Sequence, residues 1–169
     1  QQLLRLLLKI PELGEQVLRG FRRLVAVEIF VRKDLATKLW AVTSLSDGAR
    51  QLPGPLDLQL HYNTGTAFGL FADLPTIVIS IVTALFIAVV ANMWRRGRAP
   101  GGPVVLIVAG GLANVVDRVE GSGVVDMLHT GWWPTFNLAD VFITIGVAWW
   151  IGATIWSPTQ MASLVRDKV

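Results

Sequence analysis

An unbroken run of uncharged residues, 74–94, most constrains what this chain can fold into. A helix needs about 20 such residues to cross the hydrocarbon core of a bilayer. Two more uncharged runs follow, at 99–116 and 141–165, and a proline predicts that the last helix ends near Trp156. The composition agrees, because 53% of the residues are hydrophobic and only 16% are charged. We therefore predict membrane spans at about 74–94, 99–116 and 141–156.

The region 24–45 is a harder case, because charged residues interrupt its apolar pattern. Glu28 and Arg32 stand four residues apart, and so do Asp34 and Lys38. Residues at this spacing neighbour each other on a helix, and pairing lowers the cost of inserting charges. An even number of spans also requires this segment. We expect a packed transmembrane helix over 24–45, and an interfacial or partly soluble helix is the alternative.

The basic residues alternate along the chain in a way that predicts its orientation. They gather before residue 24, between 94 and 99, and after 165, whereas the connections 46–73 and 117–140 hold only Arg50 and Arg118. Because Lys and Arg in short loops stay on the cytoplasmic side, both termini should be cytoplasmic and these two connections extracytoplasmic. The net charge of +3 is spread over membrane flanks, which argues against nucleic-acid binding.

The segment 1–23 is expected to be a cytoplasmic amphipathic arm. Its apolar residues form a helical stripe made of Leu3, Leu7, Ile10, Val17, Phe21 and, at the start of the first span, Leu24. Such a helix could lie on the inner membrane surface. Pro11 and Gly14 interrupt the pattern, so one straight helix is not expected.

A strand is predicted over 56–62, where apolar and polar residues alternate with period two. A small sheet there would rest its apolar face on the membrane surface or on the outer ends of the helices. The fold class is therefore an all-α membrane protein with four transmembrane helices and a small extracytoplasmic β-sheet and loop region. The chain, 1–169, forms a single integral membrane domain.

Two carboxylates, Asp126 and Asp140, stand beside predicted spans and are the candidate reactive groups. A carboxylate near the bilayer costs free energy and is seldom found there unless it pairs, relays protons or does chemistry. Two of them suggest an acid and a base. Taken singly, Asp140 could instead cap the helix that starts at Val141, and Asp126 could be an exposed loop residue.

Other chemistries have little support in the sequence. The chain has no cysteine, which excludes a cysteine nucleophile. Its two histidines, His61 and His129, do not show a metal-ligand spacing. We expect neither a metal nor an organic cofactor.

Five short motifs along the chain match a known family. They are Asp34 to Lys38, Asn63 to Phe68, Gly110 with Asn114 to Arg118, Gly123 to Asp126, and Phe136 to Asp140. In this order they resemble the lipoprotein signal peptidases, also called signal peptidase II, which are membrane aspartic proteases of bacteria. The resemblance covers most of the chain, and the joint pattern is far more specific than any one motif.

The resemblance implies that Asp126 and Asp140 form a catalytic dyad near the outer face of the bacterial cytoplasmic (inner) membrane. It implies an endopeptidase that cleaves a diacylglyceryl-modified prolipoprotein before the lipidated cysteine. We expect membrane lipids as its surroundings and a monomer as its state. It also implies supporting or substrate-binding roles for seven more residues: Asp34, Lys38, Asn63, Gly65, Asn114, Arg118 and Asn137. Asp117 is expected to make an ionic tie that fixes the end of its helix.

The sequence departs from the family pattern at three places. The first span carries extra charges, Tyr62 stands where a basic residue commonly precedes the motif asparagine, and Ala113 stands where glycine is usual. These departures leave one alternative open, a catalytically silent or engineered membrane scaffold that keeps the family fold.

Overall fold

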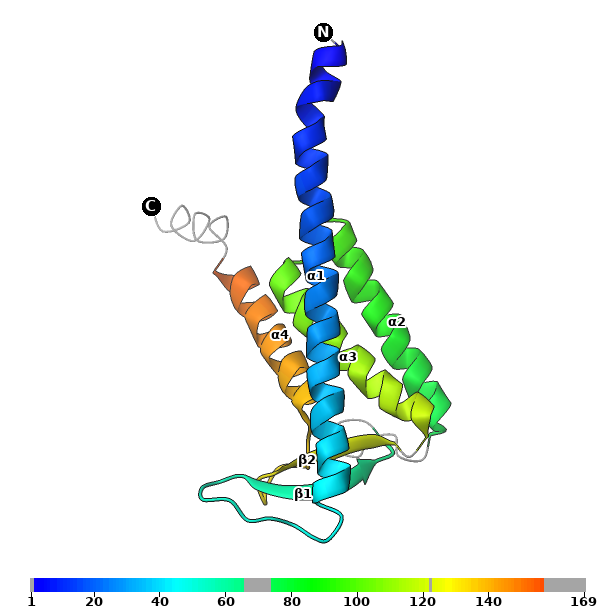
Figure 1. The fold of residues 1–169 in the computed structure, drawn as a ribbon, viewed down its shortest axis with the longest axis vertical. Coiled ribbons are helices and arrows are strands. Elements are labelled where there is room, and N and C mark those ends of the chain that lie inside the picture. The colour runs from blue at the N-terminus through cyan, green and yellow to red at the C-terminus, as the bar shows by residue number, and fades with distance from the viewer. Residues whose placement is uncertain (1, 66–73, 122, 157–169) are drawn as a thin grey trace, which may run out of the picture.

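A computed structural model of the chain describes residues 2–65, 74–121 and 123–156, with side chains from residue 15 onward (Figure 1). Four helices and a two-stranded sheet make up this part of the chain. The elements in chain order are α1 (Gln2–Ser44), β1 (Asp57–Asn63), α2 (Thr76–Arg95), α3 (Gly101–Glu120), β2 (Val124–His129) and α4 (Leu138–Ile155).

The helices α2, α3 and α4 are long and apolar enough to cross a membrane. They lie within a few residues of the predicted spans, because hydropathy and the flanking prolines and glycines define their ends. Pro75 and Pro100 stand at the N-caps of α2 and α3, and Gly121 closes α3 with a φ of 130°. By length and composition, α1 does not join this group.

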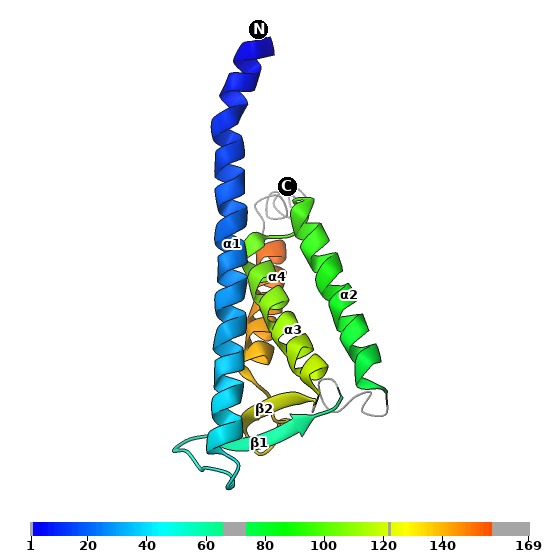
Figure 2. The same cartoon turned by 45° about the vertical axis from the view of Figure 1, so that its right-hand side comes forward.

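α1 differs most from the expectation. It runs as one continuous helix through Pro11 and Gly14, so these residues do not end it, and the arm and the region 24–45 are parts of the same element. Both views show it projecting well beyond the other helices at its N-terminal end (Figures 1 and 2). A single proline removes only one helical hydrogen bond, and the good helix formers around it outweigh that loss.

α3 is the central helix and packs against α1, α2 and α4. Small residues allow the close approach, since a Cβ on Gly110 would collide with the carbonyl oxygen of Ala139, and one on Gly146 would lie 2.9 Å from the Pro103 oxygen. By contrast, large apolar side chains on α2 and α4 are exposed, including Phe86 and Ile151. That distribution is typical of helices whose outer faces contact lipid.

The sheet lies across the ends of the helices, at the opposite end from the α1 projection (Figures 1 and 2). β1 pairs antiparallel with β2, with His61 opposite Asp126 and an irregular register between Leu58 and His61. Its apolar side packs on Ala41 and Leu45 at the end of α1. Of the two expected supports for this sheet, the structure therefore has the helix ends.

Candidate active site

Asp126 lies on β2 and is almost completely buried, with 1% of its surface exposed. Its Oδ2 accepts a hydrogen bond from Asn63 Nδ2 at 3.2 Å, and its Oδ1 accepts one from Asn137 Nδ2 at 2.7 Å. Asn63 reaches this position because β1 ends beside Gly123, where a Cβ would come within 2.8 Å of the Asn63 carbonyl oxygen. Asp126 is thus a strand residue held by amides, and the exposed-loop alternative is wrong.

Asp140 lies in the first turn of α4, where it forms a capping box with Asn137. Asn137 is the N-cap: its Oδ1 accepts the Asp140 N–H at 3.0 Å, and Asp140 Oδ2 accepts the Asn137 N–H at 3.2 Å. The N-cap is therefore Asn137, about one turn before Asp140, and the alternative in which Asp140 itself is the N-cap is wrong. Its other oxygen, Oδ1, accepts a hydrogen bond from Asn114 Nδ2 at 3.0 Å.

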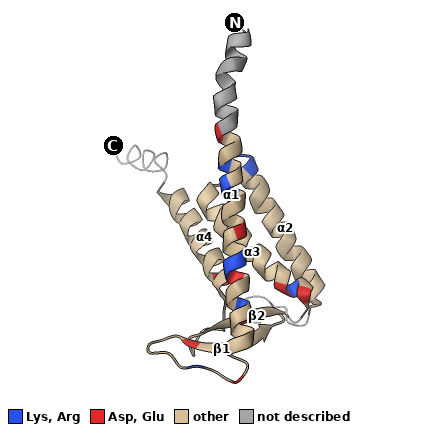
Figure 3. Cartoon of the chain, in the orientation of Figure 1, with Lys and Arg blue, Asp and Glu red and all other residues tan. Residues whose placement is uncertain are grey.

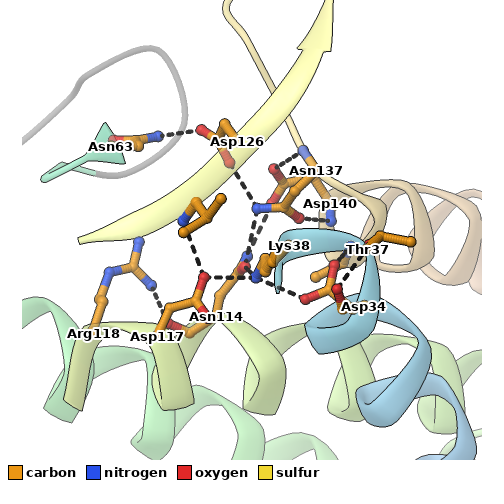
Figure 4. Close-up of polar contacts among 12 residues, drawn as sticks. Asp34, Thr37, Lys38, Asn63, Asn114, Asp117, Arg118, Asp126, Asn137 and Asp140 are labelled. Carbon is orange, nitrogen blue, oxygen red and sulfur yellow. Dashed lines mark hydrogen bonds and ion pairs between the residues drawn. The ribbon is translucent and has the colours of Figure 1, made fainter. Parts of the chain in front are cut away.

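Two asparagines join the carboxylates into one network (Figure 4). The Asn137 amide donates to Asp126 and also to Asn114 Oδ1, at 3.2 Å, while Asn114 donates to Asp140. Residues far apart in the sequence, on α3, β2 and α4, therefore converge on the same place. Among the residues that the structure describes, Asn137 is the one that hydrogen-bonds to both aspartates.

Behind this network lies a buried ionic cluster centred on Lys38. Its ammonium group lies 2.7 Å from Asp34 Oδ2 and 2.9 Å from Asp117 Oδ2, and it donates to Asn114 Oδ1 at 2.9 Å. These three partners match the three donors of an ammonium group. The ionic tie expected for Asp117 is thereby confirmed, with Lys38 as its partner. All four side chains are at least nine-tenths buried.

The two carboxylates of this cluster also accept hydrogen bonds from the backbone next to each candidate catalytic residue. Asp34 Oδ1 accepts the N–H of Ala139 at 2.7 Å, and Asp117 Oδ2 accepts the N–H of Val125 at 3.0 Å. Ala139 immediately precedes Asp140, and Val125 immediately precedes Asp126. One buried cation therefore anchors both segments that carry the aspartates. Sequence analysis missed these backbone contacts, because N–H groups leave no signal in residue identity.

Arg118 lies on the other side of the network, in the last turn of α3. Its Nη2 donates to the Gly65 carbonyl at 2.9 Å, and its Nε is buried without a hydrogen-bond partner among the described residues. Gly65 in turn donates its N–H to Asn63 Oδ1 at 3.0 Å. Arg118 thus ties the end of the β1 segment to α3 and leaves a donor free beside the aspartates.

The environment favours a proton on Asp126. Burial is the largest cause, and the negative charge of Asp140 adds to it, so the pKa of Asp126 rises from 3.8 to about 7. The hydrogen bonds from Asn63 and Asn137 favour the ionised form and oppose part of this rise. A carboxyl group with such a pKa can donate a proton at neutral pH.

A cleft of about 380 Å³ opens onto these residues. Its lining includes both aspartates, Asn63, Asn114 and Arg118. It also includes the apolar side chains of Val124, Phe136 and Ile143, together with Thr83, Trp133, Pro134 and Thr144. The cleft therefore combines two carboxyl groups with amide and guanidinium donors beside an apolar wall. Thr83 and Thr144 carry no motif, and sequence analysis did not select them.

The described part of the chain contains no group of three or more His, Asp and Glu side chains that could hold a metal ion. The nine residues selected from the sequence all take part in the two networks: Asp34, Lys38, Asn63, Gly65, Asn114, Arg118, Asp126, Asn137 and Asp140. The segment 66–73, which includes part of the Asn63 to Phe68 motif, lies outside the described residues.

Comparisons with known proteins agree on one family. A profile described as Signal peptidase (SPase) II matches residues 26–156. The lipoprotein signal peptidase of Pelodictyon phaeoclathratiforme is 35% identical over 138 residues, covering 71% of this chain and 82% of that protein. That of Aquifex aeolicus is 32% identical over 152 residues, covering 84% and 90%.

A solved structure of a bacterial membrane enzyme, obtained by the in meso method at 1.9 Å resolution, has the same fold. It is 25% identical, with a TM-score of 0.69 over 80% of this chain and 94% of that one. The profile spans well over half of the chain, and the relatives are matched over most of their length. The chain therefore belongs to the signal peptidase II family, a family of aspartic peptidases.

Proposed function

We propose that this peptidase uses Asp126 and Asp140 to remove the signal peptide from diacylglyceryl-modified prolipoproteins, cutting before the lipidated cysteine. The observation that carries the proposal is the shared contact with Asn137, whose side chain binds Asp126 and whose backbone binds Asp140. Two carboxyl groups in one buried site cannot both ionise cheaply, so the pair holds one proton. That arrangement supplies an acid and a base without a metal.

The raised pKa of Asp126 supports the following division of roles. Asp126 carries the proton and donates it to the oxygen of the scissile carbonyl. Asp140 accepts a proton from the attacking water, whose oxygen bonds to the carbonyl carbon. The tetrahedral intermediate then collapses: the C–N bond breaks, the departing amine takes the proton from Asp140, and Asp126 regains its own proton from the intermediate.

The neighbouring donors have positioning and binding roles in this proposal. Asn114 and Asn137 hold the carboxyl groups in place, and Asn63, Gly65 and Arg118 line the path of the peptide. The unpartnered Nε of Arg118 supports a contact with a substrate carbonyl, because a buried donor gains free energy when it finds an acceptor. Asp34 and Lys38 support these positions from the buried ionic cluster behind the network.

We further propose that α1 is a fourth span and that the cleft lies at the outer face of the cytoplasmic membrane. The basic residues in the middle of α1 and at the C-terminal end of α2 lie at the opposite end of the bundle from the sheet (Figure 3). Because basic flanks are retained inside, this supports cytoplasmic termini and an outer cleft. One chain supplies every residue of the site, so we expect one chain to be the catalytic unit.

An assay with purified protein in detergent tests the dyad. Processing of a synthetic lipidated prolipoprotein, followed by mass spectrometry, should yield a single cut before the modified cysteine. Asp126→Asn and Asp140→Asn should each lower kcat at least about 1,000-fold, since each removes an acid or a base. Asp47→Asn, an exposed residue outside the cleft, serves as the control.

Two results would contradict the proposal. If Asp126→Asn keeps normal kcat, the dyad is misassigned. If the unaltered protein fails to cut any lipidated precursor, the silent scaffold becomes the better interpretation. Intact folding of each variant, checked by its unfolding transition, is required for either conclusion.

A further inference from the structure

A second hollow, of about 390 Å³, adjoins the catalytic cleft, and we call it the aromatic hollow. The loop between β2 and α4 and the first turns of α4 line it, with Thr130, Trp132, Trp133, Phe136, Asp140, Val141, Thr144 and Ile145. Four of these residues also line the cleft: Trp133, Phe136, Asp140 and Thr144. Asp140 therefore stands on the wall that the two spaces share.

The two spaces differ in their chemistry. The cleft contains carboxyl, amide and guanidinium groups, whereas Asp140 is the one charged side chain among the described residues that line the aromatic hollow. The hydroxyl groups of the hollow already have partners. Thr144 donates to the Asp140 carbonyl at 2.8 Å, and Thr130 Oγ1 accepts the N–H of Trp133 at 3.2 Å. Three aromatic and two aliphatic side chains make up the rest of the lining, so the hollow suits an apolar ligand.

The aromatic hollow lies on the side of α4 that faces away from α3. Ala139 and Gly146 mark the inner side, because both lie in close contact with α3. Successive helical residues are about 100° apart, so Val141 points roughly opposite to both. Ile145, next to it on the helix surface, is 51% exposed. In the proposed topology the hollow thus opens towards lipid, whereas the cleft extends to α2 at Thr83.

The loop that carries the aromatic side chains is held in a defined shape. Phe136 and Leu128 exchange two backbone hydrogen bonds, of 2.8 and 3.0 Å, which close the loop against the end of β2. The rings of Trp132 and Trp133 pack edge to face, with their centroids 5.6 Å apart. Trp132 is nevertheless 79% exposed. An ordered aromatic wall of this kind gains free energy when an apolar group covers it and loses little side-chain entropy.

The proposed reaction brings a lipid to Asp140. Because the bond that breaks is the one before the modified cysteine, the nitrogen of that cysteine takes its proton from Asp140. The cysteine sulfur is three bonds from this nitrogen and so lies no more than about 4 Å from it. The diacylglyceryl group must therefore leave the site close to Asp140. Free phospholipid has no such link to this residue.

We propose that the aromatic hollow binds the part of the substrate's diacylglyceryl group nearest the cysteine, while the peptide lies in the cleft on the other side of Asp140. The proposal rests on the dyad and the substrate set out under the proposed function, and it adds a lipid subsite to them. The continuity of the hollow with the cleft at Asp140 is what assigns it to the substrate's own lipid. Trp132 and Ile145 then make the enzyme select substrates by their acyl chains.

Kinetics with two lipopeptides test this selection. The lipopeptides share one peptide and carry either palmitoyl or butyryl chains, and purified full-length protein cleaves each in detergent. The double variant Trp132→Ala, Ile145→Ala removes much of the apolar wall. Its ratio of kcat/KM, palmitoyl over butyryl, should fall at least about tenfold, through a higher KM for the palmitoyl substrate, because fewer methylene groups are buried. Trp156→Ala is the matched control, since this side chain is 77% exposed at the other end of α4, and its ratio should not change.

Photolabelling distinguishes the substrate's lipid from free lipid. The palmitoyl lipopeptide, with a diazirine on its acyl chain close to the ester, binds to Asp126→Asn protein in nanodiscs. Phosphatidylcholine with the same reactive chain is the comparison. Mass spectrometry should find at least about tenfold more label from the lipopeptide on residues 130–136 and 141–145, because the bound peptide raises the effective concentration of its own acyl chain there.

Either of two results would overturn the lipid subsite. Equal labelling by the two probes would mean that only free lipid covers the hollow. An unchanged palmitoyl preference in the correctly folded double variant would mean that the hollow does not bind the acyl chain. Failure of the unaltered protein to cleave either lipopeptide would instead contradict the dyad, and the labelling, which needs no cleavage, would still decide the subsite.

Discussion

At the residue scale, the site is a balance between groups that favour and disfavour charge. Asp126 sits in a strand where two amides donate to it, a setting that favours its ionised form. Burial and the charge of Asp140 act in the opposite direction, and the pKa near 7 reports that they prevail. The same balance that prepares an acid for catalysis therefore weakens the folded protein at high pH.

Because Asp126 keeps its proton more readily in the folded protein, the free energy of unfolding should depend on pH. Between the ordinary value of 3.8 and about 7, the folded protein keeps a proton on Asp126 that the unfolded chain has released. Stability from this residue is therefore full below about pH 4 and is lost as the pH rises through 7. Asp126→Asn lacks this loss, so its unfolding temperature should exceed that of the unaltered protein at pH 8, by a margin that shrinks towards pH 5. Asp47→Asn should show no such trend, and a pH-independent margin would refute the shift.

Catalysis should follow the same titration. If protonated Asp126 is the acid, kcat/KM falls as the pH rises above about 7, since the free enzyme loses its acid. Initial rates with a lipidated precursor between pH 5 and 9 would measure this limb. A rate that stays level up to pH 9 would assign the proton to another group.

Variants at Lys38 distinguish its contribution to stability from its role in positioning the Asn114 amide. Lys38→Met would leave Asp34 and Asp117 buried without their cation, which costs about 3–5 kcal/mol of stability. The triple variant Asp34→Asn, Lys38→Met and Asp117→Asn removes all three charges and keeps acceptors for the backbone N–H groups. We expect it to recover most of the unfolding temperature.

Its activity should nevertheless stay low. Without Lys38, Asn114 Oδ1 keeps only the hydrogen bond from Asn137 at 3.2 Å. The amide that donates to Asp140 is then held less firmly, so kcat should remain at least about tenfold reduced while KM changes little. Kinetics and thermal unfolding on the same preparations measure the two effects. Full recovery of kcat in the triple variant would reduce Lys38 to a structural role.

At the element scale, the sequence predicts what hydropathy and caps control. The spans of α2, α3 and α4 follow from uncharged runs and their flanking prolines and glycines. The course of α1 through Pro11 was not predictable from local rules, because a proline lowers helix propensity without forbidding a helix. β2 gives a weak signal, since its pairing with β1 depends on contacts between distant residues.

In the candidate site, too, some features could be predicted from the sequence and others could not. Residue types and motif order were enough to select the two aspartates and the asparagines around them. The link from Lys38 through Asp34 and Asp117 to the backbone of β2 and α4 appears only in three dimensions, because it uses N–H groups that every residue has. The offset of the helix cap from Asp140 to Asn137 likewise required coordinates.

Close packing between α3 and α4 should matter for the position of Asp140. A Cβ on Gly110 would overlap the carbonyl oxygen of Ala139 and lie 2.8 Å from Ile143, so Gly110→Ala must push the first turn of α4 outward. We expect a loss of about 1–3 kcal/mol in stability and at least about tenfold in kcat. Gly152→Ala, whose new Cβ would meet nothing closer than 4.0 Å, is the control. Normal activity of Gly110→Ala would mean that the helices separate without moving the site.

At the scale of the whole molecule, the arrangement divides into a basic end and a catalytic end. The sheet and the C-terminal end of α3 lie together, and the basic residues at the end of α2 and in the middle of α1 lie at the far end (Figure 3). The cleft belongs to the sheet end, because Asn63, Val124 and Asp126 line it. In the proposed topology, a peptide bond next to a lipid-modified residue reaches the aspartates from the bilayer while water arrives from outside. This geometry requires that α1 cross the membrane although its charges keep it out of the group of apolar spans.

The proposed topology predicts from which side of the membrane an introduced cysteine can be labelled. The chain has no cysteine of its own that would interfere. In oriented membrane vesicles, Asp47→Cys should react with a maleimide that cannot cross the bilayer only from the outer side, and Arg96→Cys only from the inner side. Glu15→Cys tests whether α1 crosses the membrane. If the helix spans, Glu15→Cys should be labelled from the same side as Arg96→Cys, because 29 residues of α1 separate it from Ser44 at the other end of the helix. Labelling of Glu15→Cys from the same side as Asp47→Cys would mean that α1 does not cross. The buried pair of Lys38 with Asp34 would then belong to a helix that lies along the bundle surface, and the outer position of the cleft would lose its main support.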